Sequence, residues 1–206
     1  MEDGLEVYHR PYNPARPQIC LDETSKQLVA ESRLSIPMRR GQCQRQDPEY
    51  RRWGVASVFM LSEALAGKRY VRVRSQRTQV DFAEIIRELC DELYPTAEKI
   101  VLVMDNLNTH TTASLYEAFE PAMARRLAEK LEIHYTPVHG SWLNMAEIEL
   151  SVLSRQCMTD YFENMEQLAE RVCTWERKRN TEQTCIDWRF TTADARIKLR
   201  KLYPSI

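Results

Sequence analysis

The run KIVLVM at residues 99–104 constrains the fold of this chain more than any other feature. After the lysine every position is apolar, so both faces of the predicted strand are buried and the strand lies inside a sheet, away from its edges. Asp105 follows directly. Because sites in open α/β sheets gather at the carboxyl ends of strands, Asp105 is a candidate functional residue.

A second predicted strand ends in the same way. The segment PQICLD at 17–22 reads as a short buried strand that finishes at Asp22. A single acid at a strand end is often only a turn former or a helix cap. Two acids that both follow buried strands, Asp22 and Asp105, indicate a shared site.

The remaining segments predict an α/β fold in which a mixed sheet is flanked by helices. Residues 26–36 are expected to pair beside the first strand, and the Arg-, Gln- and Pro-rich stretch after them is expected to be a loop. Further strands are expected at 53–62, 69–74 and 133–137, the first two joined by a turn with Gly67. Helices are expected at 79–93, 111–119, 121–130, from an N-cap at Ser141 onward, and at 163–178.

A third candidate acid lies on the helix after Ser141. The apolar stripe of that helix is Leu143, Ala146, Leu150 and Leu153. Asn144 and Glu147 form a polar line beside the stripe, so Glu147 is expected at the border between core and cleft. Glu149 points elsewhere and is interpreted as a solvated surface acid.

Three carboxylates in one place favour a divalent cation. Without one they repel each other, and one of them tends to keep its proton. Two metal ions about 3.5–4 Å apart can activate an attacking oxygen and stabilise a leaving oxygen at a phosphodiester. Ligands that are all oxygen select Mg²⁺ or Mn²⁺ over zinc.

The charge of the chain is unevenly distributed, although its net charge is only −1. Five basic residues and no acid lie between Lys68 and Arg77, and basic residues also concentrate at 33–52 and 196–201. This segregation favours a polyanion such as DNA as partner. The residues expected to form a track for the DNA backbone are Lys68, Arg69, Arg72 and Arg74. The alternative is that these arginines keep an exposed strand soluble, or pair with Glu84 and Glu88 on the next helix.

Other features exclude whole classes of protein. The first residues lack the apolar region of a secretory signal, and no apolar run approaches the roughly 20 residues that cross a bilayer, so a cytoplasmic protein is expected. The six cysteines form no C-x-x-C pair, which argues against a zinc cluster. All six are interpreted as reduced, small buried hydrophobes.

Three segments, taken in order, closely resemble the mariner-like superfamily of DDE transposases, in its bacterial insertion-sequence branch. They are CLDETSKQL, VLVMDNLNTH and HYTPVHGSWLNMAEIELSVLSRQC. The resemblance implies an RNase H-like fold with Asp22, Asp105 and Glu147 as catalytic and metal-binding residues. It further implies two Mg²⁺ ions that Mn²⁺ can replace, cleavage and joining of transposon ends and target DNA, a dimer on DNA, and a place at the bacterial nucleoid.

The resemblance also suggests how the chain is divided. Residues 17–160 are expected to be the RNase H-like catalytic domain, preceded by a lead-in at 1–16 and followed by a helical extension of the same domain at 161–206. Such transposases carry N-terminal helix-turn-helix modules, and no such pair of helices precedes Asp22. Sequence-specific recognition of transposon ends is therefore expected to be absent or weak, which leaves affinity for the DNA backbone.

Residues next to the three acids are expected to support them. Glu23 follows Asp22 on a strand, so it points to the opposite face and is expected to be a salt-bridge partner or to contact the metal ligands. The same supporting role is assigned to Asn106, His110, His139 and Asn144, with a DNA phosphate as the other possible contact of the two histidines. Trp142 is interpreted as core packing at the helix start, with a base-stacking platform as the alternative.

Three other functions stay open. One is a different RNase H-like nuclease, such as a retroviral-type integrase or a Holliday-junction resolvase. The spacing of 42 residues from Asp105 to Glu147, and the L-N-x-x-E pattern that ends at Glu147, favour the transposase. Another is a non-catalytic DNA-binding relic, which the three intact acids argue against. The last is a metal-dependent phosphatase, although Asp22 lacks the D-x-D arrangement of aspartyl-phosphate enzymes.

Overall fold

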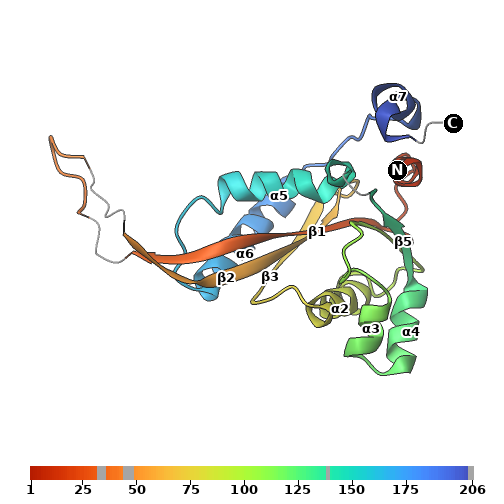
Figure 1. Cartoon of the computed structure of the whole chain (residues 1–206), viewed down its shortest axis with the longest axis horizontal. Coiled ribbons are helices and arrows are strands. Elements are labelled where there is room, and N and C mark those ends of the chain that lie inside the picture. The colour runs from red at the N-terminus through yellow and green to blue at the C-terminus, as the bar shows by residue number, and fades with distance from the viewer. Residues whose placement is uncertain (32–35, 44–48, 138–139, 204–206) are drawn as a thin grey trace.

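A mixed β-sheet forms the centre of the protein, which we analysed as a computed structural model. The structure describes residues 1–31, 36–43, 49–137 and 140–203. Within these residues a five-stranded sheet has the order β3-β2-β1-β4-β5 (Figure 1). The strands are β1 (Gln18–Glu31), β2 (Tyr50–Glu63), β3 (Lys68–Arg74), β4 (Ile100–Met104) and β5 (Leu131–Tyr135). Antiparallel pairing joins β1 to β2 and β2 to β3, whereas β4 runs parallel to both β1 and β5.

The predicted central strand is confirmed. All of β4 is buried, and it lies between β1 and β5. One expectation about its neighbour is wrong: Lys26–Glu31 does not form a separate strand beside the first one but continues β1, and 32–35 lie outside the described residues. The reason is that the outer half of β1 pairs with β2 along its whole length, as far as Glu31 opposite Tyr50.

The outer half of this β1–β2 hairpin extends away from the body of the molecule (Figure 1). The pairing register shifts between Leu28 and Val29, opposite Gly54. Gly54 has a φ of 110°, a conformation that other residues rarely adopt, so the glycine permits the bulge.

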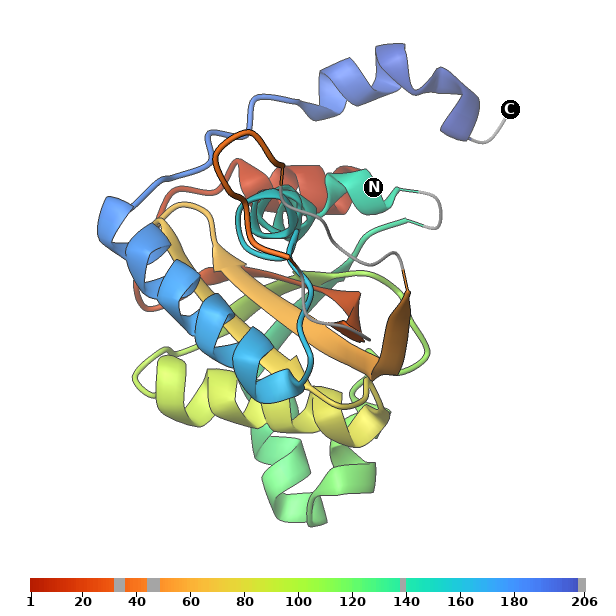
Figure 2. The ribbon, with the colours of Figure 1, turned by 90° about the vertical axis from the view of Figure 1, so that its left-hand side faces the viewer.

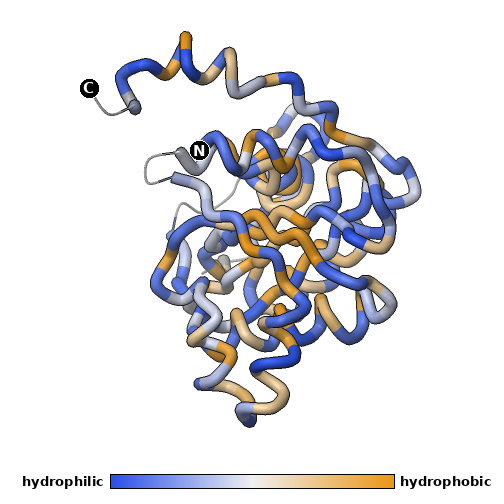
Figure 3. Tube along the Cα trace, turned by 90° about the vertical axis from the view of Figure 1, so that its right-hand side faces the viewer, coloured by the Kyte–Doolittle hydropathy of each residue, from blue (hydrophilic) through white to orange (hydrophobic). Residues whose placement is uncertain are grey.

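Helices cover both faces of the sheet, as Figures 1 and 2 show. On one face lie α1 (Glu2–Tyr8), α5 (Met145–Gln156) and α6 (Met165–Glu182). On the other lie α2 (Gln79–Glu88) with the π-helical turn η1 (Leu89–Leu93), α3 (Ala113–Ala118) and α4 (Pro121–Lys130). The short helix α7 (Thr192–Lys198), followed by the 3-10 turn η3 (Arg200–Leu202), stands apart from the sheet and pairs with α1 through Arg196 and Glu2 (Figure 3).

Alternation along β1 creates two separate cores and decides where the acids point. Cys20 packs in the core under α5 and α6, whereas Ile19 and Leu21 pack in the core under α2, α3 and α4. Because successive side chains of a strand point to opposite faces, Asp22 belongs to the α5 face and Glu23 to the α2 face. This confirms the expectation that Glu23 faces away from Asp22.

Helix α5 begins later than expected. Ser141 is not its N-cap, because Ser141–Leu143 forms a separate 3-10 turn, η2, before the chain bends. Asn144 is the N-cap instead, and its side chain accepts a hydrogen bond from the backbone N–H of Ala146. Residues 138–139, and with them the expected site residue His139, lie outside the described residues.

Two further observations concern the surface. In the ranges that the structure describes, no helix combines the length and apolar character that crossing a membrane requires. All six cysteines are free, as expected, but only Cys20, Cys90 and Cys157 are buried. The interpretation as buried hydrophobes is wrong for Cys43, Cys173 and Cys185, which lie in exposed positions.

Candidate active site

Strands β1 and β4 bring Asp22 and Asp105 to the same level of the sheet. The parallel register pairs Cys20 with Val103, and each acid follows two residues later in the chain, Asp22 within β1 and Asp105 directly after β4. Neighbouring strands are about 4.8 Å apart, so the two backbones meet at this level. Both side chains are partly buried. Asp22 and Asp105 therefore lie at one place, but the expectation that a strand finishes at Asp22 is wrong, because β1 continues to Glu31.

Helix α5 brings the third acid to the same edge. Asn144 is fully buried, and its Nδ2 donates a hydrogen bond of 2.7 Å to the backbone oxygen of Leu21, the residue before Asp22. The same side chain caps the helix, so one residue fastens the start of α5 to β1. Glu147 lies one turn further, in the first turn of the helix, and is half-buried.

The charges of these acids act on one another. Burial raises the pKa of Asp22 to about 7, and the negative charges of Asp105, Glu23 and Glu147 add to the rise, while a hydrogen bond from the Glu23 backbone N–H opposes it. A carboxyl whose charge is disfavoured by other carboxylates is well suited to a cation. Among the described residues, however, no three His, Cys, Asp or Glu side chains already surround a single point as metal ligands would.

His110 connects Asp105 to the other face of the sheet. Its Nδ1 lies 2.6 Å from Oδ1 of Asp105, and its Nε2 lies 3.2 Å from Oε2 of Glu23. The second contact has the distance of an ion pair without the alignment of a hydrogen bond, since Glu23 Oε2 has no hydrogen-bond partner among the residues that the structure describes. His110 and Glu23 are almost completely buried. His110 thus contacts both Asp105 and Glu23, and the supporting role that the sequence predicted for His110 and Glu23 stays a prediction.

The surroundings of His110 hold its ring in place. The Tyr135 hydroxyl donates to the backbone oxygen of His110, and the Phe82 ring lies 4.9 Å from the imidazole. Burial would lower the pKa of His110, but the contacts with Asp105 and Glu23 outweigh it and raise the pKa to about 9. Neither Tyr135 nor Phe82 was singled out in the sequence, because both are ordinary strand and helix residues there.

A hollow of about 310 Å³ opens beside the acids. It is lined by Glu23, Arg77 and the loop 106–109 that follows Asp105. Asn106 is exposed in this loop and lines the hollow, and its supporting role stays a prediction. Arg77 is mostly exposed, and its Nη1 lies 3.9 Å from Oε1 of Glu23. In the sequence, Arg77 was only the last residue of a basic run and was not predicted to lie near the acids.

The expected DNA track is wrong for Arg69. Its side chain is fully buried and donates to Oε1 of Glu149 at 2.8 Å. Arg69 belongs to the same alternating set as Val71, which faces α6, so strand geometry carries it inward. The interpretation of Glu149 as a solvated surface acid is also wrong, because this residue lies on the buried side of α5 and pairs with Arg69. Burial would raise the pKa of Glu149, but Arg69 and Arg179 outweigh it and hold the pKa below its ordinary value.

Arg72 does not fit the expected track either. Its Nε donates to Glu88 of α2 at 2.6 Å, and its Nη1 lies 3.5 Å from Glu176 of α6. The alternative that the sequence left open, pairing with the next helix, is therefore the observed one. Lys68 is exposed and Arg74 is half-exposed, so these two residues of the track stay accessible.

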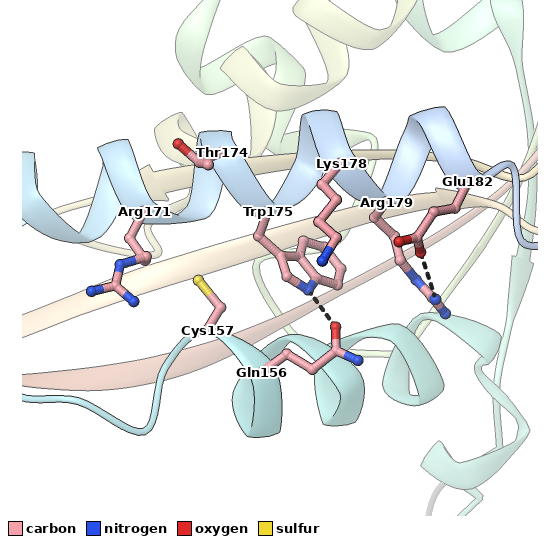
Figure 4. A pocket seen from close by; sticks show the side chains of 8 residues that line it. All are labelled: Gln156, Cys157, Arg171, Thr174, Trp175, Lys178, Arg179 and Glu182. Atoms are coloured by element: carbon pink, nitrogen blue, oxygen red, sulfur yellow. Dashed lines mark hydrogen bonds and ion pairs between the residues drawn. The ribbon is translucent and has the colours of Figure 1, made fainter.

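A larger groove lies away from the acids, between the end of α5 and helix α6 (Figure 4). Its volume is about 380 Å³, and Trp175 lies in it with its Nε1 donating to Gln156. None of Asp22, Asp105 and Glu147 lines this groove. Trp142 also departs from expectation: instead of packing in the core it is 42% exposed, with its ring edge against Phe190.

Comparison with solved structures identifies the fold. The crystal structure of the Mos1 mariner paired end complex with Mn matches with a TM-score of 0.58 at 14% identity, over 89% of this chain and 55% of that chain. The chain thus spans about half the length of that relative. A pre-cleavage Mos1 transpososome and the Mos1 Strand Transfer Complex match with TM-scores of 0.38 and 0.35 at 11% identity. The predicted RNase H-like fold, a mixed sheet flanked by helices, is confirmed.

The sequence itself identifies the family. The pattern of the family described as DDE superfamily endonuclease matches residues 17–169, about three quarters of the chain. The chain belongs to this family, as its three motifs predicted. No sequence among the curated proteins matches it.

Proposed function

We propose that this chain is the catalytic domain of a DNA transposase, with Asp22, Asp105 and Glu147 as its catalytic and metal-binding residues. The observation that carries the proposal is the arrangement of β1, β4 and α5. The strand register and the Asn144 tether bring three acids from distant segments to one edge of the sheet. Their charges act together on the pKa of Asp22.

The donor set fits a divalent cation such as Mg²⁺ or Mn²⁺, because all three side chains offer oxygen. When bound, such ions would activate an attacking oxygen and stabilise the leaving oxygen at a phosphodiester. The chain's own residues prepare this site. Asn144 holds the helix that carries Glu147. The burial of Asp22 disfavours its charged form, and a bound cation would stabilise that form.

The proposed reaction has two steps, a hydrolysis that consumes one phosphodiester bond and a transesterification that leaves the number of phosphodiester bonds unchanged. Water first hydrolyses a DNA strand at the end of the mobile element and leaves a 3′-hydroxyl. That hydroxyl then attacks a phosphodiester of target DNA, so one P–O bond forms as another breaks. The Mos1 relatives are a paired end complex and a strand transfer complex, which supports DNA ends and target DNA as substrates and a dimer as the working assembly.

Metal-dependent cleavage tests the proposal. We expect the protein to nick duplex DNA in Mn²⁺ or Mg²⁺ but not in EDTA, and the variants Asp22→Asn, Asp105→Asn and Glu147→Gln to lose at least about 100-fold in rate, since each removes an ionised ligand. Glu129→Gln is the matched control, because Glu129 is exposed on α4, where its side chain pairs with Arg125. A folded Asp105→Asn protein that nicks at the normal rate would overturn the assignment.

The same experiment separates the alternatives. A non-catalytic DNA-binding relic would bind duplex DNA with no cleavage in any metal. A Holliday-junction resolvase would cleave but would not join a pre-cut 3′ end to a second duplex, whereas a retroviral-type integrase would also join it. Joining of a labelled, pre-cut end to target DNA, lost in Glu147→Gln, therefore separates a strand-transfer enzyme from a resolvase and from a relic. The spacing of 42 residues from Asp105 to Glu147 and the L-N-x-x-E pattern favour the transposase over the integrase.

A further inference from the structure

Asp105 differs from the other two acids in being held by another side chain. Its Oδ1 lies 2.6 Å from Nδ1 of His110. Asp22 Oδ1 accepts from the backbone N–H of its own neighbour Glu23, and among the described residues Glu147 accepts no side-chain hydrogen bond. Within the described ranges only Oδ1 of Asp105 makes such a contact, and the Asp105 side chain is 28% exposed.

His110 is itself anchored from three elements. Glu23 of β1 lies against its Nε2, the Phe82 ring of α2 packs on its ring, and Tyr135 of β5 donates to its backbone oxygen. Glu23 is a carboxylate with 3% of its side chain exposed. A buried charge of this kind requires a partner, and the exposed Arg77 is 3.9 Å away, so His110 is the nearer one.

We infer that Glu23, His110 and Asp105 form a positioning relay, in which Glu23 anchors the His110 ring and the ring holds the Asp105 carboxylate in the orientation that a divalent cation needs. His110 is then a positioning residue, since it acts through Asp105. The inference rests on the proposed function, because it assigns Asp105 as a metal ligand. Residues that orient metal ligands typically change metal affinity by about 10- to 100-fold when they are replaced.

The geometry allows the two ends of the ring to be tested separately. In His110→Asn the amide nitrogen can take the place of Nδ1, so the contact with Asp105 is kept and that with Glu23 is lost. In His110→Gln the amide nitrogen can take the place of Nε2, which keeps Glu23 and loses Asp105. Both variants lose the ring against Phe82, so they share the same packing defect.

The chain contains a matched control in His134. This buried imidazole also lies between two carboxylates, with Nδ1 2.7 Å from Asp3 and Nε2 3.1 Å from Glu132. Neither carboxylate belongs to the proposed site. His134→Gln therefore reproduces the loss of a histidine bridge without touching Asp105.

The experiment measures the Kd for Mn²⁺ by electron paramagnetic resonance, together with the melting temperature in EDTA. We expect His110→Gln to raise the Kd by roughly 10- to 100-fold and His110→Asn to raise it clearly less. His134→Gln should lower the melting temperature with an unchanged Kd. In nicking assays, His110→Gln should need more Mn²⁺ for half-maximal rate and should recover much of the rate at saturating Mn²⁺.

Glu23→Gln keeps the test decisive if His110→Gln fails to fold. It preserves the shape of the side chain but removes the charge that anchors the ring, so the Kd should rise in the same direction. A folded His110→Gln or Glu23→Gln protein with the wild-type Kd would overturn the relay. Asp105→Asn separates this failure from that of the proposed function: if Asp105→Asn also binds Mn²⁺ normally, the metal site itself is wrongly assigned.

Discussion

At the scale of single residues, the state of Asp22 follows from its place on β1. The strand continues past it to Glu31, so Asp22 lies inside the sheet where water reaches it poorly. Burial and three neighbouring carboxylates raise its pKa from 3.8 to about 7. The sequence predicted that one of the clustered acids would tend to keep its proton, and the structure indicates that Asp22 is that acid.

A pH dependence of stability follows. A carboxyl whose pKa is raised by folding binds its proton more tightly in the folded chain, so its contribution to stability is full at low pH and is lost as pH rises from about 4 to about 7. Asn mimics the protonated form. In EDTA, the melting temperature of Asp22→Asn relative to wild type should therefore increase between about pH 5 and about pH 8.

The control for this experiment is Asp187→Asn, because Asp187 is exposed and its partner is the exposed Arg189. Its difference from wild type should stay constant with pH. The pKa of His110 is raised to about 9, so its contribution to stability is lost over a higher pH range than that of Asp22. This loss is the same in wild type, Asp22→Asn and Asp187→Asn. A constant difference for Asp22→Asn would show that Asp22 is ionised throughout.

At the scale of elements, the start of α5 decides whether the site exists. Asn144 and Asn164 are both N-caps that accept a backbone N–H, at the start of α5 and of α6. Asn144 alone also donates to Leu21 on β1. The sequence placed Asn144 beside Glu147 correctly but assigned the cap to Ser141, because Ser is a good cap and the intervening 3-10 turn leaves no periodic signal.

The two asparagines make a matched pair of variants. Loss of a cap costs about 1 kcal/mol of unfolding free energy, which applies to Asn144→Ala and Asn164→Ala alike. Asn144→Ala also loses a buried hydrogen bond and should cost roughly 1 kcal/mol more. It should in addition weaken Mn²⁺ binding, since Glu147 is no longer fastened to the strand of Asp22. Denaturation in urea and Mn²⁺ titration measure both effects, and equal results for the two variants would argue against the tether.

At the scale of the whole molecule, charge runs in the sequence do not map directly onto a charged surface. Arg69 and Arg72 come from the same basic run as Lys68 and Arg74, yet the fold neutralises the first two with acids from α2, α5 and α6. Arg69 and Glu149 lie 80 residues apart in the sequence. The part of the proposed DNA track that stays accessible is therefore Lys68 and Arg74.

The contribution of Lys68 and Arg74 to DNA binding is testable through the salt dependence of the affinity. Each phosphate contact contributes about −0.9 to the slope of log affinity against log salt, so Lys68→Ala/Arg74→Ala should flatten the slope by roughly two units. Arg125→Ala/Arg189→Ala is the control, because both arginines are exposed and form local ion pairs elsewhere. An unchanged slope in the folded Lys68→Ala/Arg74→Ala protein would mean that these residues only keep an edge strand soluble.

The sequence by itself determined the features that are encoded in the local order of apolar and polar residues and in short motifs. The apolar run of β4, the alternation of β3 and the three motifs were sufficient for the fold class, the family and the candidate acids, because burial on two faces and strand alternation leave a periodic record in the chain. Boundaries were predicted within a few residues for most elements, including α4. The motif order carried the identity of Asp22, Asp105 and Glu147, which the fold brings to one edge.

Only the tertiary structure decided which polar residues are neutralised or fixed by distant partners. Glu23 and His110 are separated by 87 residues, and Arg69 and Glu149 by 80, so no local pattern could indicate that these pairs meet. Burial makes such pairing obligatory, because a charge removed from water must find an opposite charge or hydrogen bonds. The partner is chosen by whichever segment the fold packs there, and that choice is a property of the assembled sheet and its helices.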